Sequence, residues 1–374
     1  MRLPRRAVRF AATAKIGFLQ VSSLIERAGA WFLRSGIQNS NGGVARYYRS
    51  DLLKNVPISN EITGYAVSTL AYLYQLTGVL AYKQAALHAA MFLVNCAWDA
   101  EASTFPFEYP PNGLAYFFDC GIIVRGLLAA WRLSGDPVYL SSAIECGRSM
   151  RADFRIGQII QPIIHLPGKR ALPHEPRWSA TPGCYQLKSA LAWHDLAQAT
   201  GEDEFHQAYE SALSQALENA EAFLPGVADR HQIMDRLHPF CYFLEGLLPV
   251  VDRPECAAAY ARGLNRVAYY LREIEPEFVR SDVYAQLLRA RLYGHALGIA
   301  PLDKAAAAQE AAQSAKFQVS SSHFSIDGGF GFGNKRGAPL PFVNPVSTAF
   351  CVQALALWSD YQRGALAPPI EALI

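Results

Sequence analysis

Acidic residues recur at the starts of apolar stretches along this sequence, where they could perform acid–base chemistry. Glu61 and Asp119 each stand between apolar or aromatic neighbours, and Asp235 and Asp282 open later stretches. Burial in such surroundings raises the pKa of a carboxyl group, so two carboxyls that face each other can divide the roles of acid and base. A structural role fits each of them as well, because helix dipoles and capping favour acids in a first helical turn.

A different kind of acid is Glu245, which lies inside the apolar stretch Phe240–Leu248. His238 precedes it by seven positions, so a helix would place both on one face. A buried carboxylate needs partners, and His238 or an arginine of a neighbouring helix would make either a structural ion pair or a proton relay. The predicted catalytic candidates are therefore Glu61, Asp119, Glu245 and Asp282.

Basic and aromatic side chains gather between His165 and Lys188. Arginine binds carboxylate or phosphate with two parallel hydrogen bonds, and aromatic faces stack on sugar rings, so this segment suits an acidic sugar or a phosphorylated ligand. An ordinary solvated loop is the alternative. This segment and residues near the candidate acids together supply the predicted substrate-binding set, which consists of Tyr65, Tyr116, His174, Arg177, Trp178, Tyr185, Gln186, His238 and Arg280.

A repeat along the chain indicates which elements position these residues. Three times an apolar stretch ends on glycine, at Gly78, Gly135 and Gly201, and an aromatic residue follows four positions later. Glycine readily adopts the left-handed conformation that ends a helix. Since a helical hairpin cannot bury its apolar face alone, the recurrence predicts a tandem array of helical hairpins.

Weaker copies of the same pattern complete a ring. We predict an all-α (α/α)6 barrel that forms one domain over residues 1–374, with its last helix paired to residues 16–34 near the start of the chain. The joins from inner to outer helices are short and the returns are long, so a functional cleft is expected where the inner helices begin. The inner helices are predicted to start near Glu61, Asp119, Pro182, Pro239, Asp282 and Pro345.

Composition limits the classes of function. Hydrophobic residues make up 51% and charged residues 18% of the chain, and the net charge of +2 gives no reason to expect a nucleic-acid partner. The cysteines form no Cys-x-x-Cys pair and no His-Glu-x-x-His string occurs, so we expect no metal and no cofactor. The glycine-rich segment 327–333 follows no predicted strand, so we interpret it as a tight turn that brings backbone close to the cleft.

The first twelve residues are predicted to form a basic leader. No apolar run reaches the roughly 20 residues of a membrane span, and no clean cleavage signature follows the leader, which favours a cytoplasmic protein. The sequence leaves an oligomer open.

Over nearly its whole length the chain resembles the six-hairpin toroid superfamily. Asn60–Tyr65 and Phe118–Gly121 are similar to inner-helix starts of its carbohydrate-processing members, which include unsaturated glucuronyl hydrolases and sugar epimerases. Gly328–Gly331, followed by Ser347–Leu355, is similar to a repeat of the terpenoid-cyclase and prenyltransferase toroids. The Asp-x-Asp-Asp string that a cyclase implies is absent from the sequence, and no prenyltransferase-like zinc site of Asp, Cys and His can be assembled.

These observations favour a carbohydrate-active enzyme that acts on an acidic or polar oligosaccharide, with Glu61 and Asp119 as acid and base. A uronate or sugar epimerase, or a lyase, is the first alternative. An enzyme of an isoprenoid or lipid-linked ligand would require an aromatic, apolar cavity. A toroid without catalytic activity that binds a partner through its loops is the remaining hypothesis.

Overall fold

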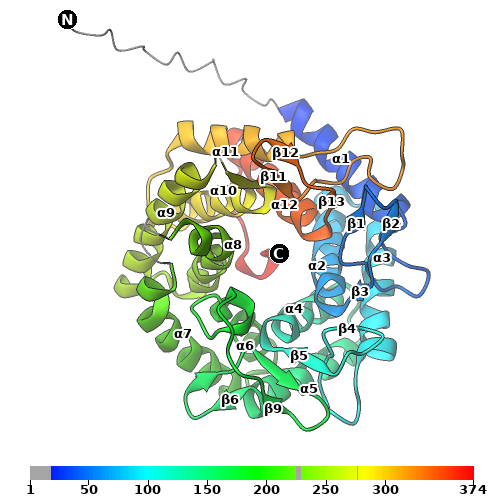
Figure 1. The fold of residues 1–374 in the computed structure, drawn as a ribbon, viewed down its shortest axis with the longest axis vertical. Coiled ribbons are helices and arrows are strands. Elements are labelled where there is room, and N and C mark those ends of the chain that lie inside the picture. The colour runs from blue at the N-terminus through cyan, green and yellow to red at the C-terminus, as the bar shows by residue number, and fades with distance from the viewer. Residues whose placement is uncertain (1–17, 225–228, 276) are drawn as a thin grey trace, which may run out of the picture.

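Twelve α-helices in the described residues form two concentric rings in the computed structural model of this protein (Figure 1). The structure describes residues 18–224, 229–275 and 277–374, so the predicted basic leader lies outside the described residues. The even-numbered helices make the inner ring, and each packs on the next until α12 meets α2. Each inner helix also packs on an outer helix. The prediction of an (α/α)6 barrel is confirmed.

The inner helices are α2 (Asn60–Thr77), α4 (Phe117–Ser134), α6 (Gln186–Thr200), α8 (Arg230–Leu247), α10 (Ser281–Ala296) and α12 (Pro345–Gln362). The outer helices are α1 (Phe18–Arg34), α3 (Leu80–Phe92), α5 (Pro137–Asp153), α7 (Asp203–Phe223), α9 (Pro254–Ile274) and α11 (Lys304–Lys316). A π-helical turn, Leu93–Ala97, extends α3, and short 3-10 turns lie at Trp178–Ala180, Leu248–Val250 and Ile370–Ala372. No described helix is long and apolar enough to cross a membrane.

Sequence pattern distinguishes the two rings. Every residue of α4 from Phe117 to Leu128 is buried, because an inner helix meets neighbours on all sides. In the outer helix α9 the buried positions recur every three or four residues, at Cys256, Ala259, Tyr260 and Gly263, as expected for one apolar face. The core therefore lies between the rings and inside the inner one.

Short joins link each inner helix to its outer partner, as the glycine repeat predicts. Gly78, Gly135 and Gly201 have φ values of 70°, 73° and 74°, and the N–H of each bonds to the carbonyl four residues earlier. A residue with a Cβ is strained in this conformation, whereas glycine is not. These glycines therefore end the inner helices and leave the short joins on one face of the ring.

The long returns lie on the other face and carry paired strands (Figure 1). Adjacent returns are joined where Ile58 pairs with Tyr109 and where Ala115 pairs with Ile164. The described strands are β1 (Tyr48–Arg49), β2 (Lys54–Asn55), β3 (Ile58–Ser59), β4 (Glu108–Tyr109), β5 (Leu114–Tyr116), β6 (Arg155–Ile156), β7 (Ile159–Ile160), β8 (Ile163–His165), β9 (Arg170–Ala171), β10 (Phe278–Arg280), β11 (Gly333–Lys335), β12 (Ala338–Pro339) and β13 (Phe342–Val343).

One boundary prediction is wrong. The fourth inner helix begins at Arg230 and not near Pro239, which lies inside α8. Asp229 caps the helix by accepting a hydrogen bond from the N–H of Gln232, a signal that the more prominent proline obscured. The third inner helix begins at Gln186, close to the start predicted near Pro182.

The seam of the ring lies between α1 and the segment that precedes α12. The Arg27 guanidinium binds the Asp327 carboxylate at 2.8 Å, and the indole of Trp31 donates to the carbonyl of Ser325 at 2.9 Å. A Cβ on Gly328 would lie 2.3 Å from the carbonyl oxygen of Arg27. The glycine-rich segment is thus a close backbone approach to α1 at the seam. At its far end a Cβ on Gly333 would lie 2.2 Å from the carbonyl oxygen of Val279, next to Arg280, and its approach to a cleft stays a prediction.

Residues 369–374 enter the centre of the ring (Figure 1). Their carbonyl groups accept hydrogen bonds from buried side chains of four inner helices. Arg125 of α4 donates to Leu373 at 2.7 Å, and Lys188 of α6 donates to Ile374 at 3.0 Å. Gln353 of α12 donates to Ala372 at 2.7 Å, and Tyr293 of α10 donates to Pro369 at 3.1 Å. This segment, hereafter the tail, therefore closes the interior from the face of the short joins.

Candidate functional site

Glu61 and Asp119 lie in the first turns of the adjacent inner helices α2 and α4. These helices pack backbone to backbone, because a Cβ on Gly126 would lie 2.6 Å from the Gly64 carbonyl oxygen. Upstream of Glu61, the Ser59 hydroxyl caps α2 and fixes where the helix begins. Two acids that are distant in sequence thus open neighbouring helices on the face that carries the long returns.

Burial raises the pKa of both carboxyl groups. The pKa of Glu61 rises to about 7, and that of Asp119 rises well above its usual range. The charge of Glu61 raises the pKa of Asp119 further, so the two groups interact. Oδ2 of Asp119 is buried and has no hydrogen-bond partner among the described residues. A pair of this kind keeps one carboxyl protonated near neutral pH while the other approaches ionisation.

Arg46 is a cation whose charge acts on both acids, and sequence reasoning missed it. Its charge lowers the pKa of both acids, against the larger effect of burial. The guanidinium binds Glu108 at 3.1 Å and lies 4.4 Å from the centroid of the Phe107 ring. Arg46 lies in a long loop between an outer and an inner helix, and no sequence motif surrounds it. Its proximity to the two acids becomes visible only when the loops pair in the folded chain.

An aromatic cluster adjoins the two acids. Phe118, next to Asp119 in sequence, lies 4.8 Å from Tyr242 and 5.9 Å from Trp178 between ring centroids. Trp178 meets Tyr185 edge to face at 5.0 Å. The backbone N–H of Trp178 donates to the carboxylate of Asp235, which fixes the short 3-10 turn against α8. Tyr65 packs on Phe350 at 5.6 Å and extends the cluster to α12.

The remaining predicted substrate-binding residues have different environments. Tyr116 is buried beside Arg177, which pairs with Glu175 at 3.2 Å and is exposed. His174 is exposed and bonds to Gln161 at 3.0 Å.

Two predicted residues have their polar atoms engaged within the protein. Gln186 accepts from the N–H of Gly183 and donates to the Ile160 carbonyl, while the Tyr185 hydroxyl donates to the carbonyl of Thr181. His174 and Arg177 are the exposed members of the predicted substrate-binding set in this segment, and Tyr185 and Gln186 are buried.

His238, Arg280 and Asp282 form one network. Arg280 bonds to both carboxylate oxygens of Asp282 and donates through Nη1 to Nδ1 of His238 at 2.8 Å. Burial and the charge of Arg280 hold the pKa of His238 well below its usual range. The Asp282 carboxylate is therefore occupied by an arginine two residues away.

Glu245 lies in a buried charge layer, which we define as Lys188, Glu245, Arg289 and Gln353. Glu245 pairs with Arg289 and, at 3.0 Å, with Lys188, while Arg289 donates to Gln353 at 2.8 Å. The arginine of a neighbouring helix is thus the partner of Glu245, and His238 is not. The predicted placement of Lys188 at the mouth of the cleft is wrong, because the residue is fully buried in α6 and bonds to the tail.

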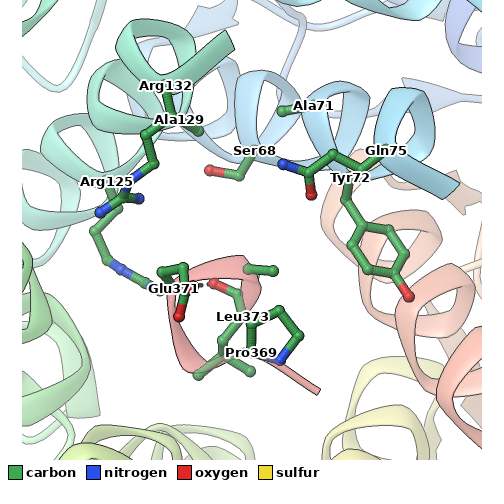
Figure 2. A pocket seen from close by; sticks show the side chains of 11 residues that line it. Ser68, Ala71, Tyr72, Gln75, Arg125, Ala129, Arg132, Pro369, Glu371 and Leu373 are labelled. Carbon is green, nitrogen blue, oxygen red and sulfur yellow. Dashed lines mark hydrogen bonds between the residues drawn. The ribbon is translucent and has the colours of Figure 1, made fainter. Parts of the chain in front are cut away.

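A cavity lies at the opposite end of the ring, beside the tail (Figure 2). It has a volume of about 110 Å³ and is lined by the later turns of α2 and α4, including Tyr72 and Arg132, and by Glu371 of the tail. It is separate from Glu61 and Asp119, which lie at the beginnings of the same helices. No group of three His, Cys, Asp or Glu side chains in the described residues could hold a metal ion.

Known structures share this architecture. The cellobiose 2-epimerase from Spirochaeta thermophila superposes with a TM-score of 0.69 at 16% identity, over 91% of this chain and 96% of that one. An unsaturated glucuronyl hydrolase from Streptococcus agalactiae superposes with a TM-score of 0.64 at 11% identity, over 99% and 100%. The chain has the (α/α)6 fold of the six-hairpin toroids. At these identities the likeness describes the fold of the toroid and not its activity.

Sequence comparison covers much less of the toroid. The human endoplasmic reticulum mannosyl-oligosaccharide 1,2-alpha-mannosidase is 32% identical over 89 residues, which are 24% of this chain and 13% of that enzyme. No family model matches the chain.

Proposed function

We propose that this toroid is a carbohydrate-active enzyme that hydrolyses a glycosidic bond, with Asp119 as general acid and Glu61 as general base. The pair of mutually interacting carboxyls at adjacent helix starts, with Asp119 buried and Glu61 half-buried, is the observation that carries the proposal. Glycoside hydrolysis needs one carboxylic acid and one carboxylate, and this pair supplies both near neutral pH. The known activities of structural neighbours, a glucuronyl hydrolase and a sugar epimerase, point to the same substrate class.

In the proposed reaction one carboxyl donates a proton and the other accepts one. Asp119 gives its proton to the glycosidic oxygen as the bond from that oxygen to the anomeric carbon breaks. Glu61 takes a proton from the water molecule whose oxygen bonds to the anomeric carbon. The unpartnered Oδ2 of Asp119 supports this role, because no protein group competes for it within the described residues.

We infer an acidic or otherwise polar oligosaccharide as substrate. Arg46 lies near the two acids, and Arg177 lies near Tyr116. Guanidinium groups bind carboxylates with two hydrogen bonds. Phe107 packs between Tyr116, with ring centroids 4.6 Å apart, and the Arg46 guanidinium, so the half-buried Trp178 is the aromatic side chain we propose to contact a sugar ring. Both arginines already pair with glutamates, at Glu108 and Glu175, so a substrate carboxylate would share or replace these partners.

The test is turnover of unsaturated and saturated uronic-acid disaccharides and of cellobiose, followed by chromatography of the products. Glu61→Gln and Asp119→Asn should each lower kcat by about 10²- to 10⁴-fold, the usual contribution of a general acid or base. Both variants must keep the wild-type circular dichroism spectrum. Full activity in either variant would contradict the assigned roles, and a toroid that only binds a partner would turn over none of these sugars.

A sugar epimerase is the second candidate, favoured by the closer superposition on the cellobiose 2-epimerase. The same acids would then move a proton at a carbon next to a carbonyl, and no bond between sugars would break. Reaction in D2O distinguishes the two. Deuterium incorporated into intact disaccharide indicates epimerisation, whereas release of monosaccharides indicates hydrolysis.

A further inference from the structure

One buried histidine on the wall of the candidate site has its orientation fixed by a charge pair. His238 is 5% exposed and lies in α8 one turn before Tyr242. Trp178 packs edge to face on its ring at 4.9 Å and Tyr242 at 5.5 Å, so the ring plane is held by aromatic contacts. The side chain therefore has a single well-defined environment beside the aromatic cluster that adjoins Asp119.

The hydrogen bond from Arg280 determines which ring nitrogen carries the proton. A guanidinium group can only donate, so Nδ1 of His238, 2.8 Å from Nη1, must accept. An imidazole that accepts at Nδ1 is neutral and carries its hydrogen on Nε2. Asp282 binds the same guanidinium through both carboxylate oxygens and keeps it in place.

The second nitrogen of the ring has no hydrogen-bond partner among the described residues. Among the described residues Nε2 makes no hydrogen bond, and it is not one of the fully buried polar atoms that lack a partner, so it keeps contact with solvent. A cavity of about 280 Å³ opens on the Arg280 side of the network, lined by Arg280, Asp235, Lys335 and three further residues, and His238 is not one of its lining residues. Such an N–H suits a substrate oxygen that accepts a hydrogen bond.

We propose that His238 binds substrate as a neutral hydrogen-bond donor through Nε2, and that Arg280 and Asp282 are positioning residues that fix its tautomer. The inference rests on the proposed function for the kind of ligand, a sugar with acceptor oxygens. It also assigns Asp282 a role other than acid or base, because the carboxylate is held by Arg280.

The tautomer is tested on the whole protein by 15N NMR of the imidazole groups, with the His238 signals identified by their loss in His238→Gln. From pH 5 to 8 we expect hydrogen on Nε2, a bare Nδ1 and no titration. Arg280→Met removes the donor to Nδ1, so the ring should no longer be held in the single tautomer with hydrogen on Nε2, while burial, the larger cause of its low pKa, remains. The groups that face the ring or its arginine are Asp235 and Tyr242 on α8, Arg280, Asp282 and Lys335, and all except Arg280 remain in that variant.

Arg291→Met is the matched control, because Arg291 also holds a buried carboxylate, that of Glu310, at 2.8 Å. It should leave the His238 signals unchanged. A wild-type ring that carries hydrogen on Nδ1 or titrates between pH 5 and 8 would overturn the proposal. Equal effects of Arg280→Met and Arg291→Met would overturn the positioning role.

Donation to a ligand is tested by calorimetric titration with cellobiose and with an unsaturated glucuronyl disaccharide. Glutamine can place an N–H near the position of Nε2, whereas asparagine reaches only that of Nδ1. His238→Asn should weaken binding about five- to tenfold, the effect of one hydrogen bond, and His238→Gln by less than about threefold. Equal weakening in both variants would contradict the donor role. If neither sugar binds the wild type, the proposed function fails, while the NMR measurement still decides the tautomer.

Discussion

At the scale of single residues, burial of Glu61 and Asp119 raises the pKa values that their proposed chemistry needs, and it lowers the stability of the folded chain when they ionise. Glu61 has a pKa of about 7 in the folded chain because burial disfavours its charge, whereas an unfolded chain ionises it near its usual value of 4.5. The group therefore contributes stability that is fully present below about pH 4.5 and is lost as the pH rises to about 7. Above pH 7 the folded protein carries the whole penalty of the buried charge.

Glu61→Gln should accordingly be more stable than the wild type at pH 8, and the difference should vanish by pH 4. A neutral amide removes the cost of a buried charge and also the repulsion that raises the pKa of Asp119. Calorimetric Tm values at pH 4, 6 and 8 would check this, with an increase of at least about 2 °C expected at pH 8. Glu371→Gln, at an exposed position, is the control. A Tm difference that is the same at every pH would contradict the expectation.

At the scale of elements, glycines at helix contacts determine how closely the inner helices approach. A Cβ on Gly126 would meet the Gly64 backbone at 2.6 Å, and one on Gly121 would meet the Ser189 carbonyl oxygen at 2.4 Å. Backbone cannot move aside as a side chain can, so these contacts set the spacing of α2, α4 and α6. Since Glu61 and Asp119 lie in the first turns of α2 and α4, the same contacts set the geometry of the pair.

Gly126→Ala should lower stability by about 1 to 3 kcal/mol, the cost of overpacking, and should also lower kcat. Gly263→Ala is the matched control in an outer helix, where the new Cβ would meet the Cδ2 atom of Leu244, the end of a flexible side chain. Urea unfolding and turnover would be measured for both variants. Loss of stability without loss of kcat in Gly126→Ala would show that the acid pair tolerates a shift between the helices.

Helix periodicity, glycine stops and loop lengths were sufficient to predict this ring and the face that carries the long returns. The predicted stops at Gly78, Gly135 and Gly201 are confirmed, since local backbone conformation determines them. Contacts made by long side chains could not be predicted. Lys188 follows a loop in sequence but extends into the core, and Arg46 reaches the acids only because separate returns pair. Which site residues act on substrate stays a prediction.

At the scale of the whole molecule, charges close the centre of the ring. The buried charge layer joins α6, α8, α10 and α12, and the tail supplies carbonyl oxygens to Lys188 and Arg289. Burial lowers the pKa of Lys188 to about 7, and the charge of Glu245 opposes that effect. Glu245 is thus the only carboxylate side chain that pairs with these two cations within the described residues. Its loss would destabilise the contacts among the four helices that the charge layer joins.

Glu245→Gln should destabilise the fold by about 3 to 5 kcal/mol, because it leaves Lys188 and Arg289 buried without their common counter-charge. Adding Lys188→Met should restore part of this loss, since one of the two unpaired cations is then removed. Glu310→Gln, which breaks a buried pair with a single arginine, is the control. Urea unfolding gives the stabilities, and turnover is compared where every variant is folded. A kcat as low as that of Asp119→Asn would make Glu245 part of the chemistry, whereas a kcat near the wild-type value would leave it a structural centre of the ring.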